Sequence, residues 1–167
     1  MGIKIVSVFY QNLDKGLPTI NALVVLVDTE TGCPSAVMDG TYLTALRTGA
    51  VSGAATELLA RADACTVAIL GTGVQGRTQL EAVCVARSIE QVFLYDPHEH
   101  VVAKFYAEML KRGAPIPKNI VICETAEVAV AEADIVESSR LSSHTRLSDL
   151  VQPLPRTTCP GGMVGSP

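Results

Sequence analysis

The chain has 167 residues, which suits one domain, and a domain of that size buries roughly two thirds of the surface that its unfolded chain exposes. Its net charge is -4 and it has no run of Lys or Arg, which excludes the basic surface that binds nucleic-acid phosphates. Apolar residues make up 48% and charged residues 18%, an excess of hydrophobic side chains that suggests further surface meant for burial.

The uninterrupted apolar stretches are far shorter than the ~20 residues that cross a bilayer. The first residues also lack the charged and then apolar pattern of a signal peptide. We therefore expect a cytoplasmic protein that does not enter a membrane. The five cysteines form no Cys-x-x-Cys pair and have no His partner at metal-ligand spacing, so no metal site is predicted.

The first third of the chain predicts a small β layer. Residues 3–9 alternate apolar and polar side chains, as in a strand, and a loop over 12–18 follows. Residues 22–27 are a continuous apolar run typical of a buried strand. Turn-forming residues at 28–32 then lead into a strand at 36–38, which predicts an antiparallel pair.

A helix is predicted over residues 41–60, because Leu43, Leu46, Ala50, Ala54 and Leu58 recur at helical spacing. At about 100° per residue, Arg47 projects into the middle of this apolar stripe. A guanidinium there needs an anionic partner, since an unpaired buried charge is unfavourable. That partner is either a carboxylate of the protein or a phosphate or carboxylate of a ligand.

From residue 66 onward the predicted elements alternate. Strands are expected at 66–70, 91–95, 119–123 and 134–136, and helices at 74–87, 98–112 and 126–131. This alternation predicts an α/β fold with a parallel, doubly wound sheet. Beyond residue 136 the segment is rich in Ser, Pro and Gly and predicts no element, so the sheet is expected to be incomplete.

The segment 71–76 reads Gly-Thr-Gly-Val-Gln-Gly and lies between a predicted strand and a predicted helix. In that context the pattern predicts a dinucleotide-binding loop. Gly71 allows a tight turn, Gly73 lets a pyrophosphate approach the backbone, and Gly76 lets the helix pack closely on the strand. The free N–H groups of the helix N-terminus attract the phosphates.

Asp96 ends the next predicted strand, about 20 residues after the last glycine of the loop. An acidic side chain there accepts hydrogen bonds from ribose hydroxyls and repels a 2′-phosphate, which favours NAD over NADP. The Asp96-Pro97 pair is also compatible with a simple turn at the start of a helix.

Two residues of the β layer stay ambiguous from pattern alone. Lys4 lies inside the first apolar strand, where it is either a substrate ligand or a charge that protects an edge strand from pairing. Thr19 follows Gly16-Leu17-Pro18 and carries no clear signal. His98, His100 and His144 fit solvent-exposed positions better than catalytic or metal-binding ones, and the catalytic residues cannot be assigned.

Taken together, these segments resemble the ornithine cyclodeaminase and mu-crystallin family, which includes alanine dehydrogenases and reductases of cyclic imino acids. The resemblance covers residues 3–136, and its most distinctive parts are Arg47-Thr48 and Gln75. The segments that carry it are 3–6, 16–19, 28–32, 38–40, 43–50, 71–75 and 133–136.

The resemblance implies roles for single residues. Lys4 would hold the substrate carboxylate, and Arg47 would lie near both the cofactor phosphates and the reacting region. Thr19, Val74 and Gln75 would contact the dinucleotide, together with Gly71 and Gly73 of the loop, and Asp96 would bind the ribose.

The resemblance also implies an organisation and an activity. Residues 1–60 would be part of a substrate and dimerisation domain with a linking helix, 61–136 a Rossmann-type NAD-binding domain, and 137–167 an irregular tail. The implied activity is NAD-dependent hydride transfer on an amino or imino acid, as oxidoreductase or deaminating cyclase, in a homodimer. The alternatives are a non-catalytic NAD(P)-binding or small-ligand-binding protein like mu-crystallin and an inactive truncated member.

Some parts of the family pattern are not expected in this chain. These are the N-terminal segment with a substrate-binding arginine, the threonine-rich loop after residue 136, and the catalytic aspartate. One interpretation is that residues 137–167 are a frameshifted or mispredicted end.

Overall fold

The computed structural model describes residues 1–139. The chain divides into two compact units, Met1–Arg47 and the part from Thr48 onward, and each is described by itself. Within the described residues, no helix combines the length and apolar character needed to span a bilayer.

The first unit is an antiparallel sheet of three strands in the order β1-β2-β3. The strands are β1 (Gly2–Val8), β2 (Ile20–Val27) and β3 (Pro34–Asp39). They confirm the three predicted strands, and the pairing of the second with the third confirms the predicted antiparallel pair. Part of the expected loop after β1 is instead a 3-10 helix, η1 (Tyr10–Lys15).

Much of the apolar surface of this sheet is exposed. Hydrophobic residues of β1 alone include Ile5 at 61% and Val8 at 48% exposure. Such a two-sided apolar sheet is typical of a surface that another protein segment covers. The other exposed hydrophobic residues of the three strands are Ile3, Val6, Leu23, Leu26, Val37 and Met38.

Helix α1 (Gly40–Leu59) confirms the predicted helix but not the face that it was expected to bury. Leu46 and Leu58 are 47% and 82% exposed, and Arg47 is also exposed. The buried positions all carry small residues, namely Gly40, Thr44, Ala45, Gly49, Gly53 and Thr56. The large side chains therefore predicted the wrong face. The face that α1 buries carries small residues, which allow the neighbouring helix to pack closely against it.

The second unit contains a parallel sheet of four strands in the order β6-β5-β4-β7. Its strands are β4 (Thr66–Leu70), β5 (Gln91–Tyr95), β6 (Ile120–Ile122) and β7 (Ile135–Ser138). Its helices are α2 (Val74–Ala86), α3 (Glu99–Arg112) and α4 (Ala126–Ala131). The α/β class and the parallel sheet are thus confirmed, with bounds within two residues of those expected.

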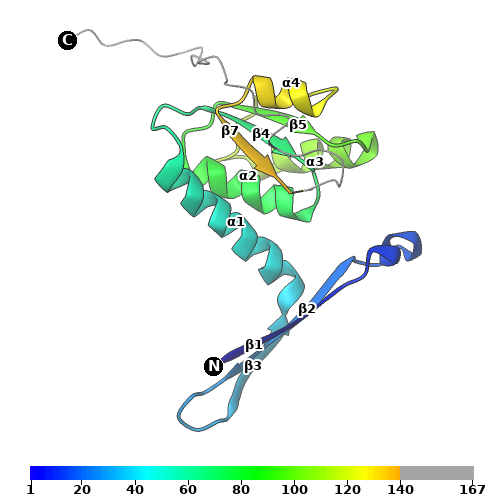
Figure 1. Ribbon diagram of the computed structural model, residues 1–167, viewed down its shortest axis with the longest axis vertical. Coiled ribbons are helices and arrows are strands. Elements are labelled where there is room, and N and C mark those ends of the chain that lie inside the picture. The colour runs from blue at the N-terminus through cyan, green and yellow to red at the C-terminus, as the bar shows by residue number, and fades with distance from the viewer. Residues whose placement is uncertain (140–167) are drawn as a thin grey trace, which may run out of the picture. The chain divides into compact units, whose positions relative to one another are not determined.

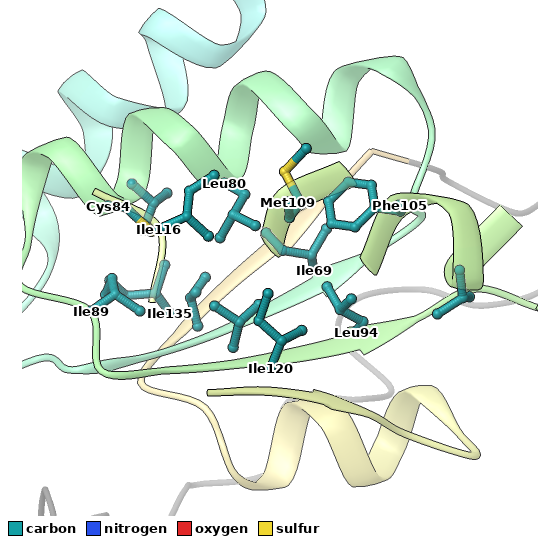
Figure 2. Close-up of a cluster of buried hydrophobic side chains, with 14 of the residues drawn as sticks. Ile69, Leu80, Cys84, Ile89, Leu94, Phe105, Met109, Ile116, Ile120 and Ile135 are labelled. Carbon is teal, nitrogen blue, oxygen red and sulfur yellow. The ribbon is translucent and has the colours of Figure 1, made fainter. Parts of the chain in front are cut away.

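Two layers of helices cover the sheet, with α2 and α3 on one face and α4 on the other (Figure 1). The middle strand β4 is buried along its whole length, so its side chains alternate between two cores. Val67 and Ile69 belong to the larger core, which also contains Leu80 of α2 and Phe105 of α3. Figure 2 shows Ile69 together with these two side chains. The smaller core packs Ala68, Leu70 and Phe93 against Ala129, Val130 and Ala133.

Candidate functional site

The glycine loop joins the end of β4 to the start of α2, as the sequence predicts. Gly71 has φ 98°, a value that glycine alone adopts readily, and its N–H donates to the carbonyl of Tyr95 at 2.8 Å. A Cβ at Gly76 would lie 2.5 Å from the carbonyl oxygen of Gly71. Only a glycine at position 76 therefore lets α2 pack this closely on the loop.

Gly73 has a different surrounding from the other two glycines. It is exposed, and a Cβ built on it meets no atom within 4 Å. It is also the N-cap of α2, no side chain of the described residues caps this end, and no acidic residue lies in the first turn. The loop thus has open space beside the N–H groups that a helix leaves unpaired at its N-terminus, an arrangement that fits a phosphate.

Asp96 lies directly after β5, beside the glycine loop. Its Oδ2 accepts hydrogen bonds from the backbone N–H of Thr72 at 2.9 Å and from the Thr72 hydroxyl at 3.4 Å. Its side chain is only 6% exposed. Burial raises the pKa of Asp96, but the hydrogen bonds from Thr72 and His98 outweigh burial and hold it below the ordinary value. Asp96 is therefore a carboxylate that helps to shape the loop.

His98 is a member of this site that sequence reasoning missed. Its backbone N–H donates to Oδ1 of Asp96 at 3.1 Å, and its imidazole Nδ1 lies 3.1 Å from the same oxygen. The side chain is 49% exposed, which agrees with the expected solvent-exposed position, although its ring also reaches Asp96. A signal was available, because residue i+2 of an Asp-Pro turn commonly binds the Asp side chain.

Arg77 is a second residue that the sequence did not single out. Its Nη1 donates to the carbonyl oxygen of Thr72 at 3.1 Å, and its Nε donates to Oε2 of Glu108 at 2.8 Å. The guanidinium also lies 5.3 Å from the ring centre of Phe105. These contacts lower the pKa of Glu108, chiefly through the hydrogen bond from Arg77. Arg77 thus anchors the glycine loop to α3.

The neighbouring strand β7 adds polar groups at the same edge of the sheet. The hydroxyl of Ser139 donates to the carbonyl of Gly71 at 2.7 Å. Glu137 accepts a hydrogen bond from the Ser52 hydroxyl at 2.9 Å, and burial raises its pKa. The chain reverses its strand order between β4 and β7, and ligands of doubly wound sheets bind at such a switch point.

The remaining predicted residues of the second unit lie at the start of α2. Val74 is 63% exposed at its first position. Gln75 is half-buried, and its carbonyl accepts a hydrogen bond from the Thr78 hydroxyl at 2.9 Å. Both lie beside Gly73, and the structure thus brings together all loop residues that the sequence predicts, with Asp96 beside them.

The other predicted residues, Lys4, Thr19 and Arg47, belong to the first unit. Lys4 is exposed on the edge strand β1, opposite Val24. Thr19 is half-buried just before β2, and its carbonyl accepts from Phe9. Arg47 is exposed, which corrects the expectation that its guanidinium lies in a buried apolar stripe, and it forms no ion pair within residues 1–139.

The part of the chain that the structure describes has no cluster of side chains suited to a metal centre. Across residues 1–139, no three His, Cys, Asp or Glu side chains lie close enough together to hold an ion. His144 lies outside the described residues.

Comparison with known proteins gives a family match over most of the chain. The family described as "Ornithine cyclodeaminase/mu-crystallin family" matches residues 1–153. This match extends beyond residue 136, where the resemblance was expected to end, and reaches into the tail.

Individual relatives agree with the family match. A Delta(1)-pyrroline-2-carboxylate reductase of Bacillus cereus is 39% identical over 155 residues, covering 91% of this chain and 46% of the relative. A structure of Thermococcus litoralis Delta(1)-pyrroline-2-carboxylate reductase with NADH and L-proline has TM-score 0.77 and 44% identity, covering 82% of this chain and 42% of that one. An archaeal alanine dehydrogenase dimer with bound NAD has TM-score 0.73 and 40% identity, covering 82% and 41%. The chain therefore spans less than half the length of these relatives.

Proposed function

The chain belongs to the ornithine cyclodeaminase/mu-crystallin family, and on that premise we propose that its second unit binds NAD. The observation that carries the proposal is the hydrogen bond that joins the glycine loop, at Thr72, to Asp96. It brings the open N-terminus of α2 and an ionised carboxylate together at one edge of the sheet. These are the two groups that recognise the pyrophosphate and the ribose of a dinucleotide.

We assign roles within this site from the chemistry of the residues. The N–H groups that follow Gly73 hold the pyrophosphate, and Val74 and Gln75 flank it. Asp96 binds the ribose and disfavours a 2′-phosphate, so NAD is preferred over NADP. When bound, the nicotinamide accepts or donates a hydride.

The activity of the whole protein is proposed as NAD-dependent amino or imino acid oxidation and reduction, or deaminating cyclisation. Relatives with bound NADH and L-proline or with bound NAD support this class. Lys4 and Arg47 are proposed to bind the acidic group of the substrate, with Arg47 and Thr19 also near the cofactor. The exposed apolar strands of the first unit support a homodimer.

A non-catalytic NAD(P)-binding protein is the second candidate, because the family includes mu-crystallin. Turnover of an imino acid such as the cyclic imine of proline would decide between the two.

The cofactor proposal is tested with the purified 167-residue chain. Thermal unfolding is followed with and without NAD, with NADP as the comparison, because a ligand that binds only the folded state raises its stability. A larger rise in melting temperature with NAD, reduced in Asp96→Asn, supports the site. If neither nucleotide shifts the transition, the proposal is wrong for this chain.

A further inference from the structure

The carboxylate of Asp96 already faces four hydrogen-bond donors from the part of the chain that the structure describes. An ionised carboxylate has about four acceptor positions. Oδ1 receives the backbone N–H of His98 and faces its Nδ1, and Oδ2 receives the N–H and the hydroxyl of Thr72. A ribose hydroxyl that binds Asp96 therefore competes with these donors for the lone pairs of the carboxylate.

The four donors differ in how easily they can leave. Two are backbone N–H groups, fixed by the glycine loop and by the start of α3. The Thr72 hydroxyl belongs to a fully buried side chain. The imidazole of His98 is half exposed, and it rotates away from Oδ1 without disturbing the backbone. His98 is the N-cap of α3, but its side chain makes no capping hydrogen bond.

We propose that the imidazole of His98 occupies the ribose-binding edge of Asp96 and is displaced when a dinucleotide binds. The inference rests on the proposed function, in which Asp96 binds the ribose. His98 is then a residue that sets cofactor affinity, because every binding event must break the Nδ1 to Oδ1 contact.

The same geometry makes His98 a determinant of specificity. The displaced ring stays beside the ribose and can donate a hydrogen bond to a 2′-phosphate, which Asp96 alone repels. Removal of the ring is therefore expected to raise the affinity for NADH more than the affinity for NADPH. His98→Ala is expected to increase both the affinity for NADH and the preference for NADH over NADPH.

The test measures the dissociation constants of NADH and NADPH by cofactor fluorescence with the full 167-residue chain. Loss of one competing hydrogen bond predicts that His98→Ala binds NADH roughly two- to tenfold more tightly than the wild type. His100→Ala is the matched control. The His100 ring lies edge-on to the His98 ring, with 6.1 Å between ring centres, but it is the His98 ring that contacts Asp96. Its affinity for NADH is expected to stay at the wild-type value.

A second measurement follows the displacement directly. The imidazole ¹⁵N resonances of His98, assigned by their loss in His98→Ala, are expected to move when NADH is added.

The outcomes separate this inference from the proposed function. In one outcome the wild type binds NADH and Asp96→Asn weakens binding, but His98→Ala binds no more tightly than the wild type. The proposed displacement of His98 is then wrong, and the proposed cofactor site stands. If the wild type does not bind NADH at all, both proposals are wrong.

Discussion

The backbone N–H of Thr72 donates a hydrogen bond to Oδ2 of Asp96 at 2.9 Å. The carbonyl of the same residue accepts one from Arg77 at 3.1 Å. The peptide groups on both sides of Thr72 are thus fixed, and its side chain is fully buried. The glycine loop is therefore held in shape by protein groups alone, and little ordering remains for a ligand to bring about.

The first prediction separates the structural glycine of the loop from the one that faces the ligand. Gly76→Ala places a methyl group 2.5 Å from the Gly71 carbonyl oxygen, and such overpacking lowers stability by about 1–3 kcal/mol. Gly73→Ala meets no atom and keeps an allowed φ of -76°. We expect thermal unfolding to show a lower melting temperature for Gly76→Ala only.

The same pair of variants tests the phosphate site. Gly73→Ala adds its methyl group where a pyrophosphate approaches, so its affinity for NADH is expected to fall although its stability does not. Equal NADH affinity in Gly73→Ala and the wild type would place the phosphates elsewhere.

The second prediction concerns Arg77 as a positioning residue. Arg77→Ala removes the hydrogen bonds to the Thr72 carbonyl and to Glu108, and charged hydrogen bonds are worth about 1.5–3 kcal/mol before solvent screening. Since Glu108 is partly exposed, we expect a loss of stability at the lower end of this range. Chemical denaturation measures it.

A control separates the two contacts of Arg77. Glu108→Gln weakens the pair with Arg77 but leaves the bond to the Thr72 carbonyl in place. NADH affinity is expected to fall in Arg77→Ala and to stay near the wild-type value in Glu108→Gln. An equal loss in both variants would mean that α3, and not the loop carbonyl, transmits the effect.

The parts of the site that the sequence predicts are those encoded by neighbouring residues. Gly71 and Gly76 follow a strand at fixed spacing, and Asp96 ends the next strand, so pattern alone locates them. The contacts of Arg77 with Glu108 and of Ser139 with Gly71 join residues 31 and 68 positions apart. Such contacts depend on the packing of separate elements, which a single sequence does not reveal.

Helix α1 shows how a helical pattern can identify the element and not its buried face. The large residues Leu46 and Leu58 predicted one face, whereas the structure buries Gly49 and Gly53. Glycine carries no hydrophobic signal, so the face that approaches α2 is invisible to hydrophobic periodicity. The exposed leucines account for part of the apolar excess that composition indicated.

The third prediction tests this close helix contact. Gly49→Ala would place a Cβ 2.5 Å from the Thr78 carbonyl oxygen, which is backbone and cannot move aside. We expect a loss of about 1–3 kcal/mol, which corresponds to several degrees in the melting temperature of a domain of this size. Ala54→Ser, at an exposed position of the same helix, is the control and is expected to change little. An unchanged Gly49→Ala would rule out the close packing of α1 on α2.

The last prediction concerns pH and the half-buried Glu137. Burial raises the pKa of its carboxyl above the ordinary 4.5, and the hydrogen bond from Ser52 offsets only part of this rise. A raised pKa in the folded state means that the folded protein binds this proton more tightly than the unfolded chain does. Glu137 therefore lowers stability as pH rises from the ordinary pKa of 4.5 through its folded pKa, and the effect is absent at pH values well below 4.5.

Glu137→Gln keeps the shape and an acceptor for Ser52 but cannot ionise. We expect it to melt at a higher temperature than the wild type at pH 7.5, with the difference shrinking toward zero at pH 4. Ser52→Ala removes the donor that favours the ionised form, so it is expected to destabilise more at pH 7.5 than at pH 4. This pH dependence should vanish when Ser52→Ala is combined with Glu137→Gln, because no ionised carboxylate is left to lose its partner. A difference between Glu137→Gln and the wild type that is the same at both pH values would mean that Glu137 titrates as an ordinary exposed carboxyl.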